Sequence, residues 1–284
     1  MISLFDDKLE KIDKKIASIE PFEVPDLFHD IPVDIFGYLL LDAPLKFPNI
    51  RAFFPSMVSN DVQDHWTGCH GISLLNQSLT FIKTLVSGYE TIAIKNLKDA
   101  IVLDFGCGWG RLIRLLYKYV PYTNIYAVDP FDESIDLCEQ HGVKCNISLS
   151  EYVPRTLPFQ RQFDLIYAFS VFTHLSEKTT HIVLNTLRRY ISDAGLLVLT
   201  VRPKEYWCVC DGGTGASDMI KIHDETGFAF LPHKRAPIDG DITYGDASIS
   251  LDYLHKNFPQ WKLQTVEYKI IDPYQVILFL TPVT

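Results

Sequence analysis

The stretch IVLDFGCGWGRLIRLL, residues 101–116, decides the fold of this 284-residue chain. A short apolar run ends at Asp104, glycines follow at positions 106, 108 and 110, and a helix-like pattern begins after them. Glycine has no Cβ and tolerates positive φ, so a turn of this kind lets a ligand approach the backbone. The stretch therefore predicts a strand, a ligand-binding turn and a helix.

Strand-like and helix-like patterns alternate regularly from residue 100 onward. Such alternation builds βαβ units, and unbroken apolar strands indicate a sheet that is covered on both faces. We therefore expect an α/β fold with a doubly wound, mostly parallel sheet. The expected strands are residues 100–105, 124–129, 143–148, 163–170, 195–201, 261–270 and 274–282, and the expected helices are residues 110–120, 133–142, 177–192 and 250–258.

Two regions depart from this alternation. Residues 4–19 and 71–88 show the apolar spacing of amphipathic helices, and a connector with six prolines between positions 21 and 55 separates them. Residues 204–247 are rich in Gly, Asp, His and aromatics, which predicts a loop-rich insertion after the fifth strand. The expected organisation is an N-terminal helical cap region over residues 1–95 and a main domain over residues 96–284 that contains this insertion.

Composition excludes several classes of protein. The formal net charge is −9 and basic residues do not cluster, so the sequence lacks the footprint of a nucleic-acid-binding protein. The N-terminus lacks the apolar core of a signal peptide, and no apolar run approaches the roughly 20 residues of a membrane helix. We expect a cytoplasmic protein with six reduced cysteines. Cys208 and Cys210 are too close in sequence for a standard zinc pair, so no metal is expected; the oligomeric state is not indicated.

The glycine turn fits two classes of nucleotide-like ligand. Dinucleotide sites follow the pattern G-x-G-x-x-G, whereas Arg111 occupies the position of the third glycine here. Asp129 ends the second expected strand, where an acidic side chain can accept hydrogen bonds from ribose hydroxyls. That role suits both classes, and the simpler alternative for Asp129 is a helix cap. Arg111 therefore weakens, without excluding, an NAD(P)-dependent oxidoreductase.

Three motifs in order along the chain carry a family resemblance, and the second of them is Asp129 with Pro130 and Phe131 at the end of the second expected strand. Leu103–Gly110, LDFGCGWG, resembles the first motif of class I S-adenosylmethionine-dependent methyltransferases, and Phe163–Leu175, FDLIYAFSVFTHL, is similar to the fourth-strand motif of small-molecule members. The resemblance implies a Rossmann-like methyltransferase fold, with S-adenosylmethionine as cofactor and S-adenosylhomocysteine as product. The cofactor-binding residues that it implies or suggests are Asp104, Phe105, Gly106, Cys107, Gly108, Gly110, Asp129, Pro130, Phe131, Ser148, Leu149, Phe169 and Ser170, with Trp66 and Gly71 from the N-terminal region.

Some of these assignments have open alternatives. The family often has an acidic residue after the third strand; here Glu151 is the nearest acid, and Ser148 or Leu149 is an equally possible wall residue. Trp66 suits a structural anchor of the following helix as well as a border of the cofactor site.

The acceptor side is expected in residues 204–247. His174 is the first candidate for a general base, because it follows the fourth strand; its alternative is to cap or pack the next helix. His223 is the second candidate, and Tyr206, Asp211 and Tyr244 are candidate acceptor-binding residues. The motifs FSVFTHL, H-x-x-x-G-F-A-F at residues 223–230, YGDAS and DPYQVILFL resemble, more weakly, a bacterial subgroup that accompanies sugar and secondary-metabolite pathways. This resemblance favours a small-molecule or glycan acceptor, methylated at oxygen by in-line displacement. The alternatives are the oxidoreductase and a non-catalytic binding module with the same fold.

Overall fold

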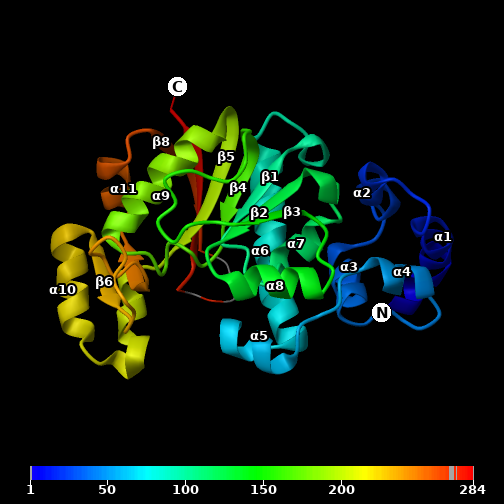
Figure 1. The fold of residues 1–284 in the computed structure, drawn as a ribbon, viewed down its shortest axis with the longest axis horizontal. Helices are drawn as coiled ribbons and strands as arrows, with labels where there is room; N and C mark the ends of the chain where they lie inside the picture. The colour runs from blue at the N-terminus through cyan, green and yellow to red at the C-terminus, as the bar shows by residue number, and fades with distance from the viewer. Residues whose placement is uncertain (1, 269–271, 273, 284) are drawn as a thin grey trace. The chain divides into compact units, whose positions relative to one another are not determined.

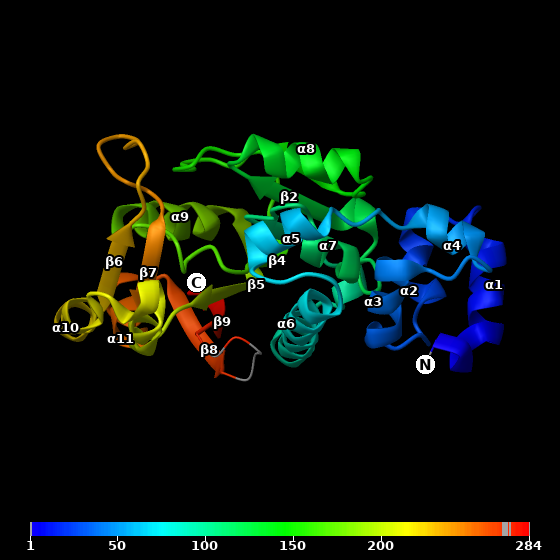
Figure 2. The same cartoon turned by 90° about the horizontal axis from the view of Figure 1, so that it is seen from below.

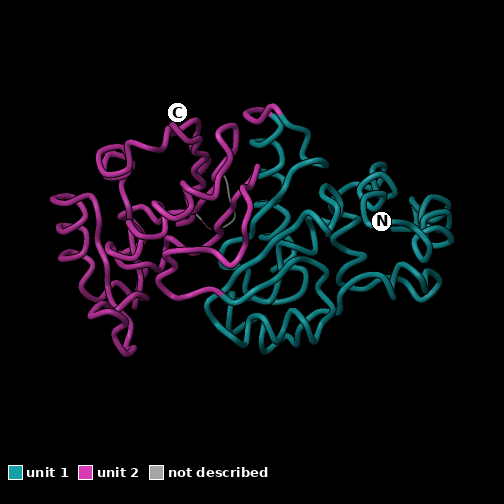
Figure 3. The backbone as a smooth tube through the Cα atoms, turned by 45° about the horizontal axis from the view of Figure 1, so that its top comes forward, with its two compact units in different colours: residues 1–90, 95–149 teal, residues 91–94, 150–284 magenta. Residues whose placement is uncertain are grey.

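The structure, a computed structural model, describes residues 2–268, 272 and 274–283. It contains two compact units, coloured separately in Figure 3. Unit 1 comprises residues 1–90 and 95–149, and unit 2 comprises residues 91–94 and 150–284. No helix in the described part of the chain is both long and apolar enough to cross a membrane.

Unit 1 contains the glycine turn and three strands. β1 (Val102–Phe105), β2 (Ile125–Asp129) and β3 (Asn146–Leu149) pair in parallel, in the order β3-β2-β1. All four residues of β1 are buried, as the apolar pattern predicts. The helices that begin in this unit are α1 (Asp6–Ile16), α2 (Val24–Leu27), α3 (Val33–Asp42), α4 (Pro48–Phe53), α5 (Asn60–Thr67), α6 (Gly71–Ile92), α7 (Arg111–Leu116) and α8 (Asp132–Gln140), with short 3₁₀ helices at Ile2–Phe5, Pro21–Glu23, Leu97–Asp99 and Tyr122–Asn124.

The N-terminal helices α1 to α4 form a group of their own within unit 1 (Figure 1). α1 buries Leu9, Ile12 and Ile16, which confirms its predicted amphipathic face. The proline-rich connector is more regular than its composition suggests, because Pro25 and Pro48 occupy the first turns of α2 and α4. Proline is tolerated there, since the first backbone N–H groups of a helix have no partner inside it.

Unit 2 holds the remaining strands of the main domain. β4 (Phe163–Ala168) and β5 (Ile191–Val201) pair in parallel, and β9 (Val276–Pro282) and β8 (Trp261–Glu267) add antiparallel neighbours in the order β4-β5-β9-β8. α9 (Glu177–Tyr190) joins β4 to β5, and α11 (Leu251–Asn257) precedes β8. The helix predicted over residues 177–192 ends two residues early. Lys269, Ile270 and Pro273, which fall within or between the predicted closing strands, lie outside the described residues.

The insertion after β5 is more ordered than predicted. After the 3₁₀ helices η5 (Lys204–Cys208) and η6 (Cys210–Gly213), it contains α10 (Ala216–Thr226) and a hairpin of β6 (Phe228–Pro232) and β7 (Gly245–Ile249). Figure 2 shows the loop between β6 and β7 extending well beyond the two strands. The prediction of a loop-rich insertion is wrong for α10 and the hairpin, whose short strands give little alternation to detect.

Candidate active site

The glycine turn of unit 1 has the backbone conformation that the sequence predicts. Gly106, Gly108 and Gly110 have φ values of 81°, 52° and 74°, all in the left-handed region. Gly110 is the residue before α7. A Cβ at Gly110 would lie 3.1 Å from Val143 and 3.2 Å from the thiol of Cys138. Both the conformation and the close packing therefore favour glycine.

Asp129 joins the end of β2 to this turn. Its Oδ2 accepts a hydrogen bond of 2.9 Å from the backbone N–H of Gly108, and its Oδ1 accepts one of 3.0 Å from the N–H of Phe131. Asp129 is 8% exposed, and burial raises its pKa although these hydrogen bonds oppose the rise. The hydrogen bond from Phe131, just before α8, fits the alternative prediction that Asp129 caps a helix. The hydrogen bond from Gly108 connects Asp129 with the ligand-binding turn. Each carboxylate oxygen can accept further hydrogen bonds.

An aromatic pair borders the same turn. The rings of Trp66 and Phe131 lie 5.7 Å apart between centroids, with 35° between their planes. Ring atoms of Trp66 lie 3.7 Å from the position of a Cβ on Gly108, and Phe131 is 45% exposed. Trp66 also packs against the buried cluster of Val58, Leu74 and Trp109, so it has a structural contact in addition. The pair offers aromatic surface beside the glycine turn.

Most of the other predicted cofactor residues of unit 1 lie in or near the ends of its strands, whereas Gly71 is the first residue of α6. Leu149 is the register neighbour of Asp129 on β3 and is 48% exposed, whereas Ser148 is half-buried. Gly71 borders a separate small cavity of about 20 Å³ with Trp109 and Arg111. Asp104 and Phe105 are buried in β1, Cys107 is buried and Pro130 is half-buried.

Phe169 and Ser170 lie in unit 2, just beyond β4. Phe169 is 9% exposed. Ser170 has a φ of 61°, its N–H donates to Thr200 Oγ1 over 2.7 Å, and its Oγ accepts from Gln275 Nε2 over 2.9 Å. A non-glycine residue held at positive φ by such bonds is a strained conformation typical of functional sites.

Six side chains of unit 2 form what we call the Asp246 cluster. They come from the segment after β4, the end of β5, η5, and the β6–β7 hairpin with its loop. The side chains of His174, Arg202 and Asp246 are 18%, 11% and 14% exposed, so most of the charge is shielded from water. The members are His174, Arg202, Tyr206, His233, Tyr244 and Asp246.

Asp246 is the acceptor at the centre of this cluster. Its Oδ1 accepts from Arg202 Nη1 and, over 2.8 Å, from the hydroxyl of Tyr206. Its Oδ2 lies 2.8 Å from His233 Nε2. Burial alone would raise the pKa of Asp246, but the bonds from His233 and Tyr206 and the charge of Arg202 lower it on balance. Asp246 is therefore an ionised, fully engaged carboxylate at neutral pH.

His174 lies beside this carboxylate as a neutral imidazole. Its Nδ1 is 2.7 Å from the carbonyl oxygen of Gly245, and its Nε2 is 3.4 Å from Arg202 Nη2. Its ring stacks on Tyr244 at 4.9 Å between centroids and 7° between planes. Burial and the Arg202 charge lower its pKa to about 4, against the opposing effects of Gly245 and Asp246.

Arg202 is held on several sides. Its Nη1 also donates to the carbonyl of Thr173 over 3.0 Å, and its guanidinium lies 3.9 Å from the ring centroid of Tyr206. A second guanidinium, that of Arg235, lies 4.2 Å from the centroid of Tyr244. Two arginines therefore stack on the two predicted tyrosines.

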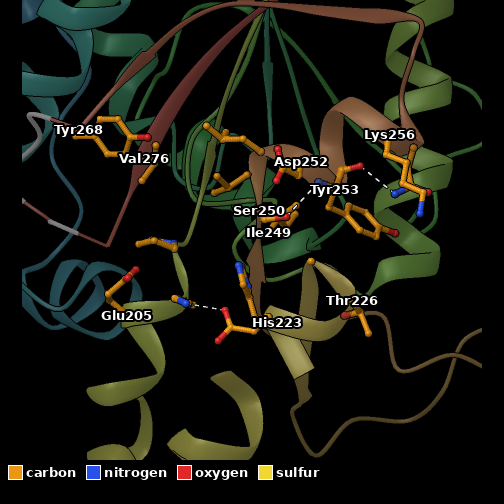
Figure 4. A pocket seen from close by; sticks show the side chains of 17 residues that line it. Glu205, His223, Thr226, Ile249, Ser250, Asp252, Tyr253, Lys256, Tyr268 and Val276 are labelled. Atoms are coloured by element: carbon orange, nitrogen blue, oxygen red, sulfur yellow. Dashed lines mark hydrogen bonds and ion pairs between the residues drawn. The ribbon is translucent and has the colours of Figure 1, made fainter. Parts of the chain in front are cut away.

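His223 borders a different cavity of unit 2. This pocket of about 660 Å³ lies between α10, α11 and the ends of β5 and β9, and Figure 4 shows His223 and Glu205 on one side with Tyr253 and Lys256 on another. His223 is 7% exposed, and its Nδ1 lies 2.7 Å from Ser248 Oγ, which also accepts from the indole N–H of Trp207. Burial lowers the pKa of His223.

Asp211, the remaining predicted acceptor residue, is exposed, with a φ of 46°. It belongs neither to the Asp246 cluster nor to the lining of the His223 pocket.

Sequence reasoning did not single out Arg202 or His233. Arg202 follows the last residue of β5, and the carboxyl end of a parallel strand is a general location for functional residues. That signal was available. His233 joins Asp246 only through the hairpin, which the sequence pattern did not reveal. In the part of the chain that the structure describes, no three His, Cys, Asp or Glu side chains are grouped to hold a metal ion.

Comparison with known proteins identifies a methyltransferase domain in part of the chain. A sequence profile described as a methyltransferase domain matches residues 102–195, from β1 into β5. Residues 102–195 therefore match a methyltransferase domain, in agreement with the resemblance to class I S-adenosylmethionine-dependent methyltransferases. This confirms the predicted family, the Rossmann-like fold and S-adenosylmethionine as the cofactor of that family.

Individual relatives agree with the methyltransferase-domain match. The chain is 29% identical over 130 residues to a malonyl-[acyl-carrier protein] O-methyltransferase of Halalkalibacterium halodurans, a match that covers 44% of this chain and 47% of that protein. The chain thus spans less than half the length of the curated relatives it matches.

Solved structures show the same fold. An S-adenosylmethionine-dependent methyltransferase of Clostridium acetobutylicum is 13% identical with a TM-score of 0.50, over 79% of this chain and 97% of the other. A magnesium protoporphyrin IX methyltransferase of Synechocystis with bound S-adenosylhomocysteine is 15% identical with a TM-score of 0.50, over 82% and 92%.

Proposed function

We propose that this methyltransferase transfers the methyl group of S-adenosylmethionine to an oxygen of a small-molecule or glycan acceptor by in-line displacement. The observation that carries the donor half is the hydrogen bond between Gly108 and Asp129 beside the Trp66–Phe131 pair. When bound, the cofactor supplies a methyl group already activated on a sulfonium, so the protein mainly aligns donor and acceptor.

The residues of unit 1 fit distinct parts of this cofactor. Asp129 is suited to the ribose hydroxyls, because carboxylate oxygens accept from adjacent hydroxyl donors. Phe131 and Trp66 provide aromatic surface for the adenine ring. Asp104, in β1, is proposed to attract the ammonium group, and the glycines let the backbone pass close to the ligand.

We place the acceptor half of the reaction in residues 204–247 and the adjoining strand ends. The Asp246 cluster supports this, because it brings His174 and Arg202, from the segments after β4 and β5, together with hairpin residues. Methylation at oxygen is favoured by the similarity to the Halalkalibacterium halodurans protein, which is named an O-methyltransferase. We propose residues 1–95 as the cap region, and the six free cysteines fit a cytoplasmic location.

The geometry argues against His174 as the general base. A base must present a lone pair, and the Nε2 of His174 faces a guanidinium N–H. We therefore propose that His174 positions other groups of the acceptor site. His223 lies in the separate pocket and is the second candidate for proton transfer.

Ligand-dependent melting tests the donor assignment. S-adenosylhomocysteine should raise the melting temperature of the purified protein, since a ligand at one hundred times its Kd stabilises the folded state by about 2.7 kcal/mol. NADH should have no effect. The reverse result would establish an oxidoreductase-like site, and binding without methyl transfer to any component of a cell extract would establish the non-catalytic alternative.

A further inference from the structure

The Asp246 cluster is rich in charge, and its most buried histidine, His174, is not available as a base. The Nδ1 of His174 faces the carbonyl of Gly245, which can only accept, so Nδ1 carries the proton. Nε2 is then the only lone pair of the ring, and Arg202 Nη2 lies 3.4 Å from it. A proton taken up at Nε2 would place a second cation beside Arg202.

The other members are also engaged. Both oxygens of Asp246 have donors, and the hydroxyl of Tyr206 donates its proton to Asp246. Burial raises the pKa of Tyr206, so its phenol remains protonated. His233 is 42% exposed and uses Nε2 to contact Asp246, so Nδ1 is the remaining basic atom of its ring.

Two guanidinium groups contact this cluster, which contains one carboxylate. Asp246 balances Arg202, while Arg235 lies over the ring of Tyr244. The loop between β6 and β7 also carries Lys234, Asp239 and Asp241, whose charges offset one another in part. A protonated amine would be repelled by the guanidinium of Arg235, which Asp246 does not balance. A neutral hydroxyl would require a base. A carboxylate is already ionised at neutral pH and is attracted.

We propose that the acceptor is a carboxylate bound through the guanidinium of Arg202, and that the product is a methyl ester. This rests on the proposed methyl transfer and names its substrate class. A carboxylate oxygen forms the new bond to the methyl carbon while the carbon–sulfur bond breaks and its electron pair returns to sulfur. One anion and one sulfonium become a neutral ester and a neutral thioether, and no proton has to be moved. Arg202 suits the task, because a guanidinium presents five N–H donors in a planar fork that matches a carboxylate.

The stability of the product to alkali tests this assignment even while the acceptor is unidentified. The protein is incubated with methyl-labelled S-adenosylmethionine and a small-molecule extract of its source organism, and the labelled product is treated with mild alkali. A methyl ester releases the label as volatile methanol, which is the expected result. Label that stays bound indicates an ether, amine or thioether, which overturns the carboxylate but leaves methyl transfer intact. Absence of any labelled product overturns the proposed function and this inference together.

Variants of Arg202 test its part. Arg202→Lys keeps the charge but loses the planar fork, and we expect KM for the labelled acid to rise at least tenfold with unchanged affinity for S-adenosylhomocysteine. Arg202→Gln, which also loses the charge, should raise KM for the labelled acid further. Lys221→Gln, which removes a charge from a 72% exposed side chain, should match the unchanged protein. An unaltered KM in Arg202→Lys would overturn the role of Arg202. A product whose label resists alkali, together with a hundredfold lower kcat in His233→Gln, would also overturn it.

Discussion

Asp129 links β2 to the glycine turn through one carboxylate, since Gly108 and Phe131 each donate a backbone N–H to it. Replacing it by alanine should weaken S-adenosylhomocysteine binding by about 1–3 kcal/mol, because a charged hydrogen bond is lost and buried donors lose their partner. Isothermal titration calorimetry measures this change. Asp132→Ala, on the exposed start of α8, is the matched control and should bind normally. Equal affinities in both variants would disprove the ribose role of Asp129.

His174 makes stability depend on pH in a defined direction. Its pKa is lowered from 6.5 to about 4 by burial and Arg202, with Asp246, Gly245 and His233 also facing it. Between these values the unfolded chain binds the proton and the folded chain does not, so stability falls as pH drops from 6.5 towards 4. The contribution of His174 should fall by roughly 2 kcal/mol between pH 7 and pH 5.

Urea titrations at pH 7 and pH 5 measure this dependence. His174→Gln should lose that part of it, whereas the contribution of His223, whose pKa is also lowered, should remain in both proteins. If the unchanged protein and His174→Gln show the same pH dependence of the free energy of unfolding, burial and Arg202 do not lower the pKa of His174 in the folded state.

At the scale of elements, α10 ends at Gly227, which packs against the start of α11. This residue ends the helix with a φ of 80°, and a Cβ there would lie 2.8 Å from Ser250 Oγ and 2.9 Å from Tyr253 Cβ at the start of α11. Gly215, which precedes the same helix, has a φ of 72° and open space around it. Both alanine variants incur the left-handed strain of about 1–2 kcal/mol, but only Gly227→Ala adds overpacking of about 1–3 kcal/mol.

Comparison of the two variants by urea unfolding isolates the contact between α10 and α11. Gly227→Ala should be the less stable by the overpacking difference. Equal losses of unfolding free energy in the two variants would show that α11 can shift to accept the extra methyl group. The packing at Gly227 would then not fix the position of α10.

The elements also show which features the sequence could predict. Glycines at 106, 108 and 110 have a local cause, positive φ in one turn, and the pattern revealed it directly. The Asp246 cluster has no local cause. Asp246 and His233 oppose one another only because β6 pairs with β7, and Arg202 reaches them from β5. Short strands of five residues carry too little alternation to indicate such a pairing.

At the scale of the whole molecule, strand and helix alternation was enough to predict the α/β class, because central parallel strands such as β1 and β4 are largely buried and therefore apolar along their length. The N-terminal helices α2 and α4 were missed because their prolines suggested a connector, although proline also begins helices. The assignment of the donor depended on motif resemblance in addition to these patterns, and the acceptor residues emerged only from the structure.

The central claim is that the glycine turn and Asp129 hold S-adenosylmethionine. A crystal structure of the protein soaked with S-adenosylhomocysteine tests it directly. We predict the ribose hydroxyls within hydrogen-bond distance of Asp129, the adenine against Phe131, and the methionine-derived part of the ligand beside Gly106 and Gly108. Density for the ligand elsewhere, or a ribose that does not contact Asp129, would contradict this claim.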